Sequence, residues 1–306
     1  MLLLLATAFK QPTLKMKKIV LAFFILLTIA GCTKTKTEVI DINIPGNVPP
    51  PDYTTDSVIP GTYINKAYIN LIGREPTAVE KVNGLTILRQ HNFSTDDREQ
   101  FINAFFSKPE YTINVFNVAN NEYLRNLDSL EIKQQLDLFN YLLGQPQYSS
   151  FYDYINAEIR RIDTLKTVLP QMLAGTMDYK QMLARMTDNY FYDQINMGSE
   201  NFVVSIYQNF LFRYPSDAEL LAGKTVVDGG QATVFLKLGS SKHDYINIFF
   251  GTDDYYEGQV RFVFKKYLFR EPTSAEIYLY ANLYKSTNDF KQLEKAVFIT
   301  DEYAGI

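Results

Sequence analysis

The sequence has few of the residues that build metal and redox sites. Its 306 residues include one cysteine, two histidines and no tryptophan. One cysteine excludes a disulfide framework and a thiolate zinc site, and two histidines exclude a three-histidine metal site. The attachment motif of a c-type haem, Cys-x-x-Cys-His, is absent from the sequence. We therefore expect no cofactor and no bound metal.

The sequence also lacks an apolar run long enough to span a membrane. The nearly apolar run Ile19–Ile29 has 11 residues, whereas a spanning helix needs roughly 20. Lysines precede this run, and Ala30-Gly31 follows it. That order is typical of a secretory signal peptide. We predict a signal peptide over residues 1–31, with Met16 as the true start because residues 1–15 do not fit the pattern.

The single cysteine lies directly after the predicted signal peptide. Ile29-Ala30-Gly31-Cys32 resembles a bacterial lipobox, in which the signal peptidase cleaves before the cysteine and the thiol is diacylated. The resemblance implies a lipid anchor on Cys32, since two or three acyl chains give durable membrane binding. Thr33 follows in place of Asp, which implies the outer membrane of a Gram-negative bacterium. An ordinary signal peptide with a chance cysteine is the alternative.

The chain after the signal peptide is acidic. Residues 1–31 hold four of the 30 basic residues and none of the 34 acidic ones, so 26 basic residues face 34 acidic ones and the remainder has a formal net charge of −8. Nucleic-acid binding depends on neutralising phosphates with Lys and Arg. We therefore expect no nucleic-acid partner.

A proline-rich segment follows the cysteine. Five of the 12 prolines lie between Pro45 and Pro60, and three of them are consecutive. We predict residues 32–60 to be the lipidated cysteine and a disordered tether, because proline-rich segments are extended spacers. A strand over residues 39–44 that docks on the body of the protein is the alternative.

The rest of the chain contains an internal repeat. An Arg-x-Pro motif recurs in Tyr68–Glu80, Tyr207–Glu219 and Phe264–Glu276. A closing motif, Phe followed five residues later by Tyr, recurs in Phe106–Tyr111, Phe250–Tyr255 and Phe298–Tyr303. The intervals from arginine to tyrosine are 37, 42 and 33 residues. Two motifs that recur three times in the same order indicate three copies of one structural unit.

Each copy predicts a helix, a proline turn and a second helix. Apolar residues at helical spacing precede the arginine, and the proline ends that helix. A hydroxyl residue and a glutamate three positions later then predict a capping box. The motif residues are Arg74, Pro76, Thr77 and Glu80, then Arg213, Pro215, Ser216 and Glu219, then Arg270, Pro272, Thr273 and Glu276. A loop and a third helix, which ends in the closing motif, complete the unit.

The sequence therefore predicts an all-α fold. We expect an irregular multi-helix array with three copies of the helix–proline turn–helix–helix unit, after the signal peptide and the tether. Residues 61–199 form a helical region with copy 1, and residues 200–306 form a helical region with copies 2 and 3. Residues 112–199 also have apolar residues at helical spacing but no clean fourth copy.

These motifs resemble a known kind of repeat. The run Leu-x-Gly/Phe-Arg-x-Pro-Thr-x-x-Glu, with a later Phe-Ser-x-x-Glu-Tyr ending, is similar to the helical repeats related to phycobilisome linker domains. It also resembles the N-terminal helical domain of planctomycete surface proteins that carry cytochrome modules. The resemblance covers residues 61–111 and 200–303 and implies a helical fold. It carries no catalytic residue, and it implies no bilin chemistry here.

The three repeat arginines allow two interpretations. Arg74, Arg213 and Arg270 either cap helix ends or form ion pairs, for instance with the capping glutamates, or they bind a ligand as a set. A cation at a helix C-terminus is favoured by the helix dipole, and this favours the structural interpretation.

Two other segments match functional motifs only in part. Gly223-Lys224-Thr225 matches the end of a phosphate-binding loop, but Ala218 stands where the first glycine is required. We therefore expect no nucleotide. The segment Ser240–Asp244 contains Ser, His and Asp, but triads converge from distant positions. A serine that caps a helix is the alternative interpretation.

These observations favour a lipid-anchored envelope lipoprotein that acts as a non-catalytic scaffold or protein-binding module. The expected partners are the membrane, through the lipid on Cys32, and another envelope protein. The 22 tyrosines and 22 phenylalanines, without tryptophan, favour protein contacts over sugar contacts. Two alternatives stay open: a carboxylate-based hydrolase acting on glycan or peptidoglycan, and the ligand-binding component of a surface polysaccharide-uptake complex.

Overall fold

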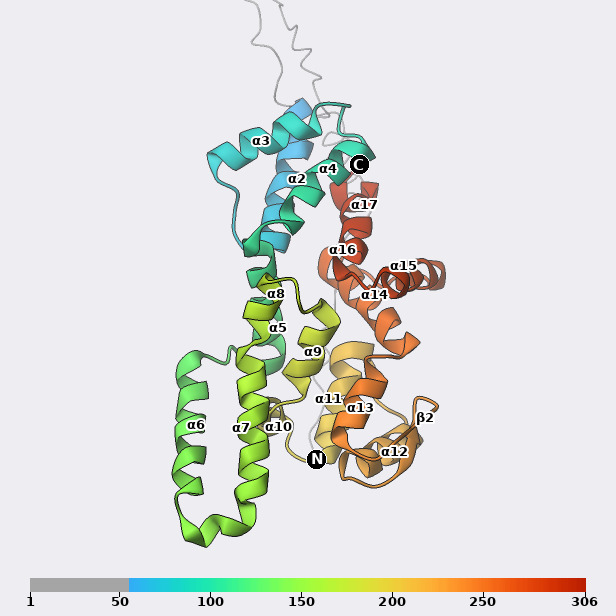
Figure 1. Cartoon of the computed structure of the whole chain (residues 1–306). Helices are drawn as coiled ribbons and strands as arrows, with labels where there is room; N and C mark the ends of the chain where they lie inside the picture. Colours follow the sequence, from blue (N-terminus) through green and yellow to red (C-terminus); the bar gives the residue numbers. More distant parts are fainter. Residues whose placement is uncertain (1–54) are drawn as a thin grey trace, which may run out of the picture. The chain divides into compact units, whose positions relative to one another are not determined.

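The computed structural model describes residues 55–306, which are built almost entirely of helices (Figure 1). The all-α prediction is confirmed. The predicted signal peptide, Cys32 and most of the predicted tether lie outside the described residues. Within residues 55–306, no helix combines the length and the apolar character that crossing a membrane requires.

The helices follow the order that the repeat predicts. Copy 1 contains α2 (Thr55–Ile72), α3 (Ala78–Leu88) and α4 (Thr95–Phe106). The middle segment contains α5 (Pro109–Leu124), α6 (Ser129–Leu143), the 3-10 helix η1 (Pro146–Phe151), α7 (Tyr152–Lys166), α8 (Val168–Leu173), α9 (Tyr179–Thr187) and α10 (Tyr190–Ile195). Copy 2 contains α11 (Ser199–Leu211), α12 (Asp217–Val227), β1 (Ala232–Val234), β2 (Lys237–Gly239) and α13 (Lys242–Phe249). Copy 3 contains α14 (Asp253–Tyr267), α15 (Ser274–Thr287) and α16 (Phe290–Phe298), and α17 (Asp301–Ala304) follows.

The predicted tether extends too far. Helix α2 begins at Thr55, so the last residues of the predicted 32–60 segment belong to the first helix, and Pro60 lies inside it. A proline inside a helix removes one backbone hydrogen bond. Tyr63 and Ile64, three and four residues after Pro60, are fully buried, and their burial holds this part of the helix against the core.

The second helix of every copy starts with the predicted capping box. Thr77, Ser216 and Thr273 accept a hydrogen bond from the backbone of the glutamate three residues on, and that glutamate accepts one from the backbone of the capping residue. Two backbone N–H groups at each helix start are satisfied in this way. The chain therefore leaves the proline turn in the same geometry three times.

The closing motif spans a break between two helices, and it does not end the third helix as predicted. In each copy the phenylalanine lies at the end of one helix and the tyrosine lies in the first turn of the next: Tyr111 in α5, Tyr255 in α14 and Tyr303 in α17. The serine and threonine residues in the break favour the start of a new helix. Thr252 and Thr300, for example, cap the following helix. Helix α14 therefore closes copy 2 and opens copy 3.

Copy 2 contains a β-hairpin that the other two copies lack. Strands β1 and β2 pair antiparallel between α12 and α13. The two turn residues, Phe235 and Leu236, have φ angles of 48° and 63°. Two-residue hairpin turns with positive φ usually carry Asn and Gly, so this turn could not be recognised from its residues.

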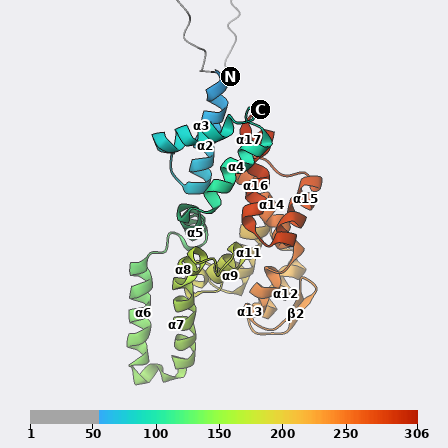
Figure 2. The same cartoon turned by 45° about the horizontal axis from the view of Figure 1, so that its top comes forward.

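Copies 1 and 3 lie side by side although they are far apart in the chain. Helix α4 packs against α16, and α2 packs against α17 (Figure 2). Arg98 of α4 is almost fully buried; it donates to the backbone oxygen of Ile299 and to Asp301 at 2.6 Å. Most of the buried apolar side chains of copies 1, 2 and 3 form one continuous core.

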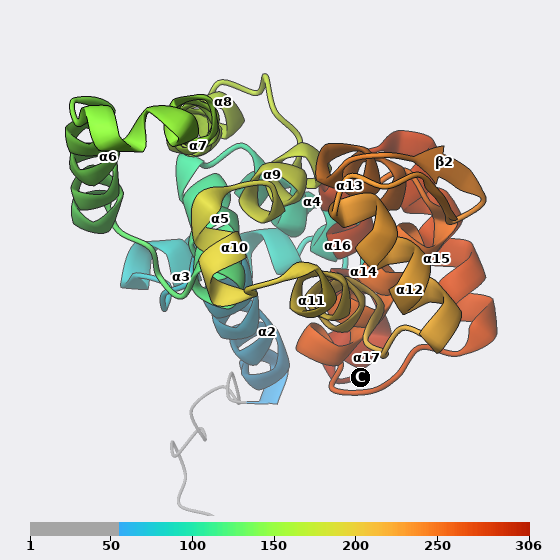
Figure 3. The ribbon, with the colours of Figure 1, turned by 90° about the horizontal axis from the view of Figure 1, so that it is seen from below.

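Helices α6 and α7 form a hairpin with a separate small core. They run side by side, away from α12 and α15 (Figure 3). The buried residues between them and α10 are Phe139, Ile155 and Ile162. Because this core is small, most of the surface of α6 and of the start of α7 faces solvent.

Candidate functional site

The three repeat arginines each bind the capping glutamate of the same copy through two hydrogen bonds. The shortest distances from guanidinium nitrogen to carboxylate oxygen are 2.8 Å for Arg74–Glu80, 2.7 Å for Arg213–Glu219 and 2.6 Å for Arg270–Glu276. Each arginine lies beyond the end of the opening helix and not in its last turn. The fork-to-fork geometry is the strong form of an arginine–carboxylate pair.

The same arginines also contact two further groups of their copy. Each guanidinium lies over the aromatic ring six residues earlier, 5.6 Å from Tyr68, 4.7 Å from Tyr207 and 5.0 Å from Phe264. Each also faces the acidic residue directly before the closing tyrosine, at 2.9 Å from Glu110, 3.9 Å from Asp254 and 2.6 Å from Glu302. We call each such set of four side chains a repeat clamp. It links the opening helix, the second helix and the helix after the close.

The clamps shift the pKa of their glutamates downward. The hydrogen bonds from Arg213 and Arg270 lower the pKa of Glu219 and Glu276 to about 2. Arg74 likewise holds the pKa of Glu80 well below its usual range. The charge of each arginine is thus already neutralised by carboxylates of its own copy, and the geometry is that of a structural contact.

A buried carboxylate links copy 1 with copy 3. Glu294 of α16 accepts hydrogen bonds of 2.6 Å from the hydroxyls of Tyr111 in α5 and Tyr267 in α14. All three side chains are buried, and burial raises the pKa of Glu294. Glu294 could not be recognised from the sequence, because an isolated Glu in a helix gives no signal of burial.

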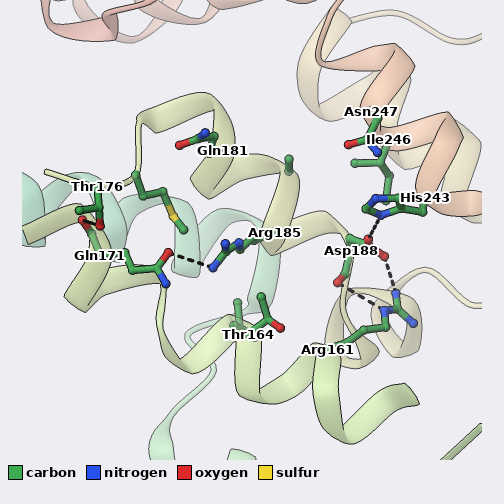
Figure 4. Close-up of a pocket in the computed structure, with 13 residues that line it drawn as sticks. Arg161, Thr164, Gln171, Thr176, Gln181, Arg185, Asp188, His243, Ile246 and Asn247 are labelled. Atoms are coloured by element: carbon green, nitrogen blue, oxygen red, sulfur yellow. Dashed lines mark hydrogen bonds and ion pairs between the residues drawn. The ribbon is translucent and has the colours of Figure 1, made fainter. Parts of the chain in front are cut away.

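The structure contains a cavity of about 460 Å³ between α7, α8, α9 and α13 (Figure 4). Its polar lining includes Arg161, Arg185, Asp188, His243 and Asn247, and its size lies in the usual range of small-molecule sites. The cavity brings the middle segment and copy 2 together. It was not predicted, since its residues come from segments about 55 residues apart.

A network of charges lies along one side of this cavity. Arg161 donates to Glu158 at 2.7 Å, to Asp188 at 2.9 Å and to Asp193 at 3.1 Å. Lys242 pairs with Asp193, and Nδ1 of His243 lies 2.9 Å from Asp188. Burial raises the pKa of Glu158 and lowers that of Lys242. Arg161 therefore has three acidic neighbours and no nitrogen left for another group.

The two partial motifs are explained by local contacts. Ser241 caps α13, and Asp244 binds Ser240 and Ser241, whereas His243 binds the distant Asp188. The serine, histidine and aspartate of this segment therefore do not form a triad. Gly223-Lys224-Thr225 lies inside α12, and the ammonium group of Lys224 binds Glu200 at 2.6 Å.

Aromatic side chains gather on the surface at the turn between α6 and α7. The exposed fractions are 63% for Tyr141, 39% for Tyr148, 56% for Phe151 and 55% for Tyr154. Asp153 is the one charged residue between Asp137 and Glu158. We call this surface of residues 141–154 the aromatic tip.

Comparisons with known proteins leave the family open. Neither a scan against protein-family models nor searches of curated proteins and of solved structures found a match. Within residues 55–306, no group of three or more His, Cys, Asp and Glu side chains is arranged to hold a metal ion. The similarity of the repeat to phycobilisome-linker-like repeats stays a prediction from the sequence.

Proposed function

We propose that this protein is a membrane-anchored envelope lipoprotein that acts as a non-catalytic scaffold or protein-binding module. The lipid on Cys32 attaches it to the membrane, and the aromatic tip contacts an envelope protein. The observation that carries the proposal is the exposure of four aromatic rings on one helical hairpin.

The composition of the tip suits a protein partner. Tyrosine gives a large contact area with little loss of conformational entropy, and Ser, Asn and Gln adapt their hydrogen bonds to a partner. Residues 141–154 contain four tyrosines together with Ser and Gln, and no basic residue. A surface that binds anionic lipid would instead need Lys and Arg.

The cavity of about 460 Å³ gives little support to the alternative hydrolase. A glycosidase of the common type needs two carboxylates that flank the scissile bond. Asp188 is the one carboxylate among the residues that line the 460 Å³ cavity, and it is bound to Arg161 and His243.

A crosslinked pull-down of the full-length lipidated protein from its own membrane tests the proposal. The tip variant carries Tyr141→Ser, Phe151→Ser and Tyr154→Ser. A matched control carries Tyr214→Ser and Tyr278→Ser, two tyrosines that are 70% and 76% exposed elsewhere on the surface. We expect the wild type and the control to capture one dominant envelope protein, and we expect the tip variant not to capture it.

Cys32→Ser, which lacks the anchor, serves as a second comparison. The same partner should be captured less from this variant, because the anchor concentrates the protein at the membrane. If every partner is captured equally by the tip variant, the aromatic tip is not the contact surface. A glycan and peptidoglycan screen would then follow.

A further inference from the structure

The cavity between α7, α8, α9 and α13 contains a guanidinium group, that of Arg185, which no acidic residue of the described part of the chain neutralises. Nη1 of Arg185 donates to the hydroxyl of Thr167 at 3.2 Å and to the side-chain oxygen of Gln171 at 3.1 Å. Both acceptors are uncharged. Among residues 55–306, no carboxylate lies within ion-pairing distance of Arg185, although the second arginine of the cavity has three.

The free edge of Arg185 has the geometry for a carboxylate. Its Nε and Nη2 atoms make no hydrogen bond with the described residues, so two parallel N–H groups are left for a ligand (Figure 4). Two parallel N–H groups match the two oxygens of a carboxylate. Arg185 is half-buried and lines the cavity, so a carboxylate bound there would lie partly away from water.

The rest of the cavity suits a hydroxylated molecule with one negative charge. The side-chain amide of Asn247 makes no hydrogen bond with the described residues, and Gln181 and Thr176 add further polar groups. Uncharged amides and hydroxyls bind hydroxyl groups without selecting a charge. Buried Leu165, Met177 and Ile246 supply an apolar wall that can contact the C–H face of a ring.

We infer that this cavity binds a sugar acid, with the carboxylate on Arg185 and the hydroxyls on Asn247 and the neighbouring amides. A phosphate monoester fits less well, because it carries nearly two charges and Arg161 is already saturated by Glu158, Asp188 and Asp193. This site is independent of the aromatic tip, since the two surfaces share no residue.

Isothermal titration calorimetry of the full-length chain in detergent tests the inference. The probes are D-glucuronate and D-galacturonate, with D-glucose and D-galactose as neutral controls. We expect the acids to bind at least tenfold more tightly than the neutral sugars, since a charge-assisted hydrogen bond is about twice as strong as a neutral one. Trigalacturonate distinguishes two natural sources of the ligand. A site for a free sugar acid should bind the monomer and the trimer with equal affinity, whereas a site for an acidic polysaccharide should bind the trimer more tightly.

Two substitutions connect binding to Arg185. Arg185→Gln should weaken binding of the acids at least tenfold, and Arg185→Lys, which keeps the charge without the fork, should weaken it less. Arg160→Gln is the matched control, because Arg160 is exposed on α7 and does not line the cavity. A thermal melt confirms that each variant is folded. The inference is overturned if neither acid binds the wild type, or if folded Arg185→Gln binds as well as Arg160→Gln.

Discussion

The residue directly before the repeat arginine has a left-handed backbone in every copy of the repeat. Gly73, Phe212 and Phe269 have φ angles of 80°, 56° and 56°. This conformation ends the helix ahead of the Arg-x-Pro turn. A Cβ atom on Gly73 would lie 2.5 Å from the side-chain oxygen of Asn114, so any other residue there would also displace the Asn114 side chain. The other two copies have phenylalanine at this position, and the left-handed backbone of a residue with a side chain is strained.

Replacing Phe269 by glycine should stabilise the protein slightly. A side chain in the left-handed region costs roughly 1–2 kcal/mol, and the extra freedom of glycine in the unfolded chain offsets about 0.5–1 kcal/mol of this. The Phe269 ring is 86% exposed, so little packing is lost. Urea denaturation should therefore show a gain of up to about 1 kcal/mol. Phe269→Ala keeps the Cβ atom and should show no gain; a clear loss in Phe269→Gly would mean that the ring makes a stabilising contact.

The buried Glu294 should be costly to remove. Glu294→Ala leaves the hydroxyls of Tyr111 and Tyr267 without their acceptor inside the core. Each buried unsatisfied group costs about 1–3 kcal/mol, so we expect a loss of about 3–5 kcal/mol in the free energy of unfolding. Glu294→Gln keeps one acceptor oxygen and should lose less. Equal stability of the Ala and Gln variants would show that the two hydroxyls find other partners.

At the scale of helices, the repeat clamps determine how the units respond to acid. The pKa of Glu276 is about 2 in the folded protein and about 4.3 in an unfolded chain. Between these values the unfolded chain takes up a proton that the folded chain does not, so falling pH favours unfolding. The stability from this pair is complete above about pH 4.3 and is lost as the pH falls toward 2.

Arg270→Gln removes the cause of this shift. We expect the thermal midpoint of the wild type to fall more steeply between pH 5 and pH 2 than that of Arg270→Gln. The comparison isolates the clamp, because Glu294, whose pKa is shifted upward by burial, is unchanged in both proteins. Arg160→Gln, which removes an exposed arginine without an ion pair among the described residues, should follow the wild-type curve. Parallel curves for wild type and Arg270→Gln would contradict the role of the clamp.

The helices could be predicted from the sequence, because their signals lie within short segments. The features that depend on contacts between distant residues could not be predicted. Apolar spacing and the capping boxes located the opening and second helices, since both signals lie within one helix. The β-hairpin was missed because Phe235 and Leu236 are not turn residues. The cavity was missed because His243 gives no sign in the sequence of its partner Asp188. The acid before each closing tyrosine was visible in the sequence, but its contact with the repeat arginine was not.

At the scale of the whole body of residues 55–306, copy 1 is joined to copy 3 through α17. Tyr303 is fully buried; its hydroxyl accepts a hydrogen bond from Asn70, and its backbone oxygen accepts one from Lys66. Tyr63 in turn donates to the backbone oxygen of Phe298. These contacts connect residues more than 230 positions apart in sequence. The stability of the first described helix therefore depends on the short helix α17.

Truncating Tyr303 should reveal this dependence. Tyr303→Ala removes an aromatic side chain from the core, which costs about 3–5 kcal/mol, whereas Tyr303→Phe loses one hydrogen bond and costs about 1 kcal/mol. Native-state hydrogen exchange should show lower protection of the α2 amides in Tyr303→Ala, and not only of those in α17. Protection lost in α17 alone would show that α2 is held by α3, α4 and α5 without it. Because the core is continuous from α2 to α16, we expect the loss to spread through copy 1 and into α16.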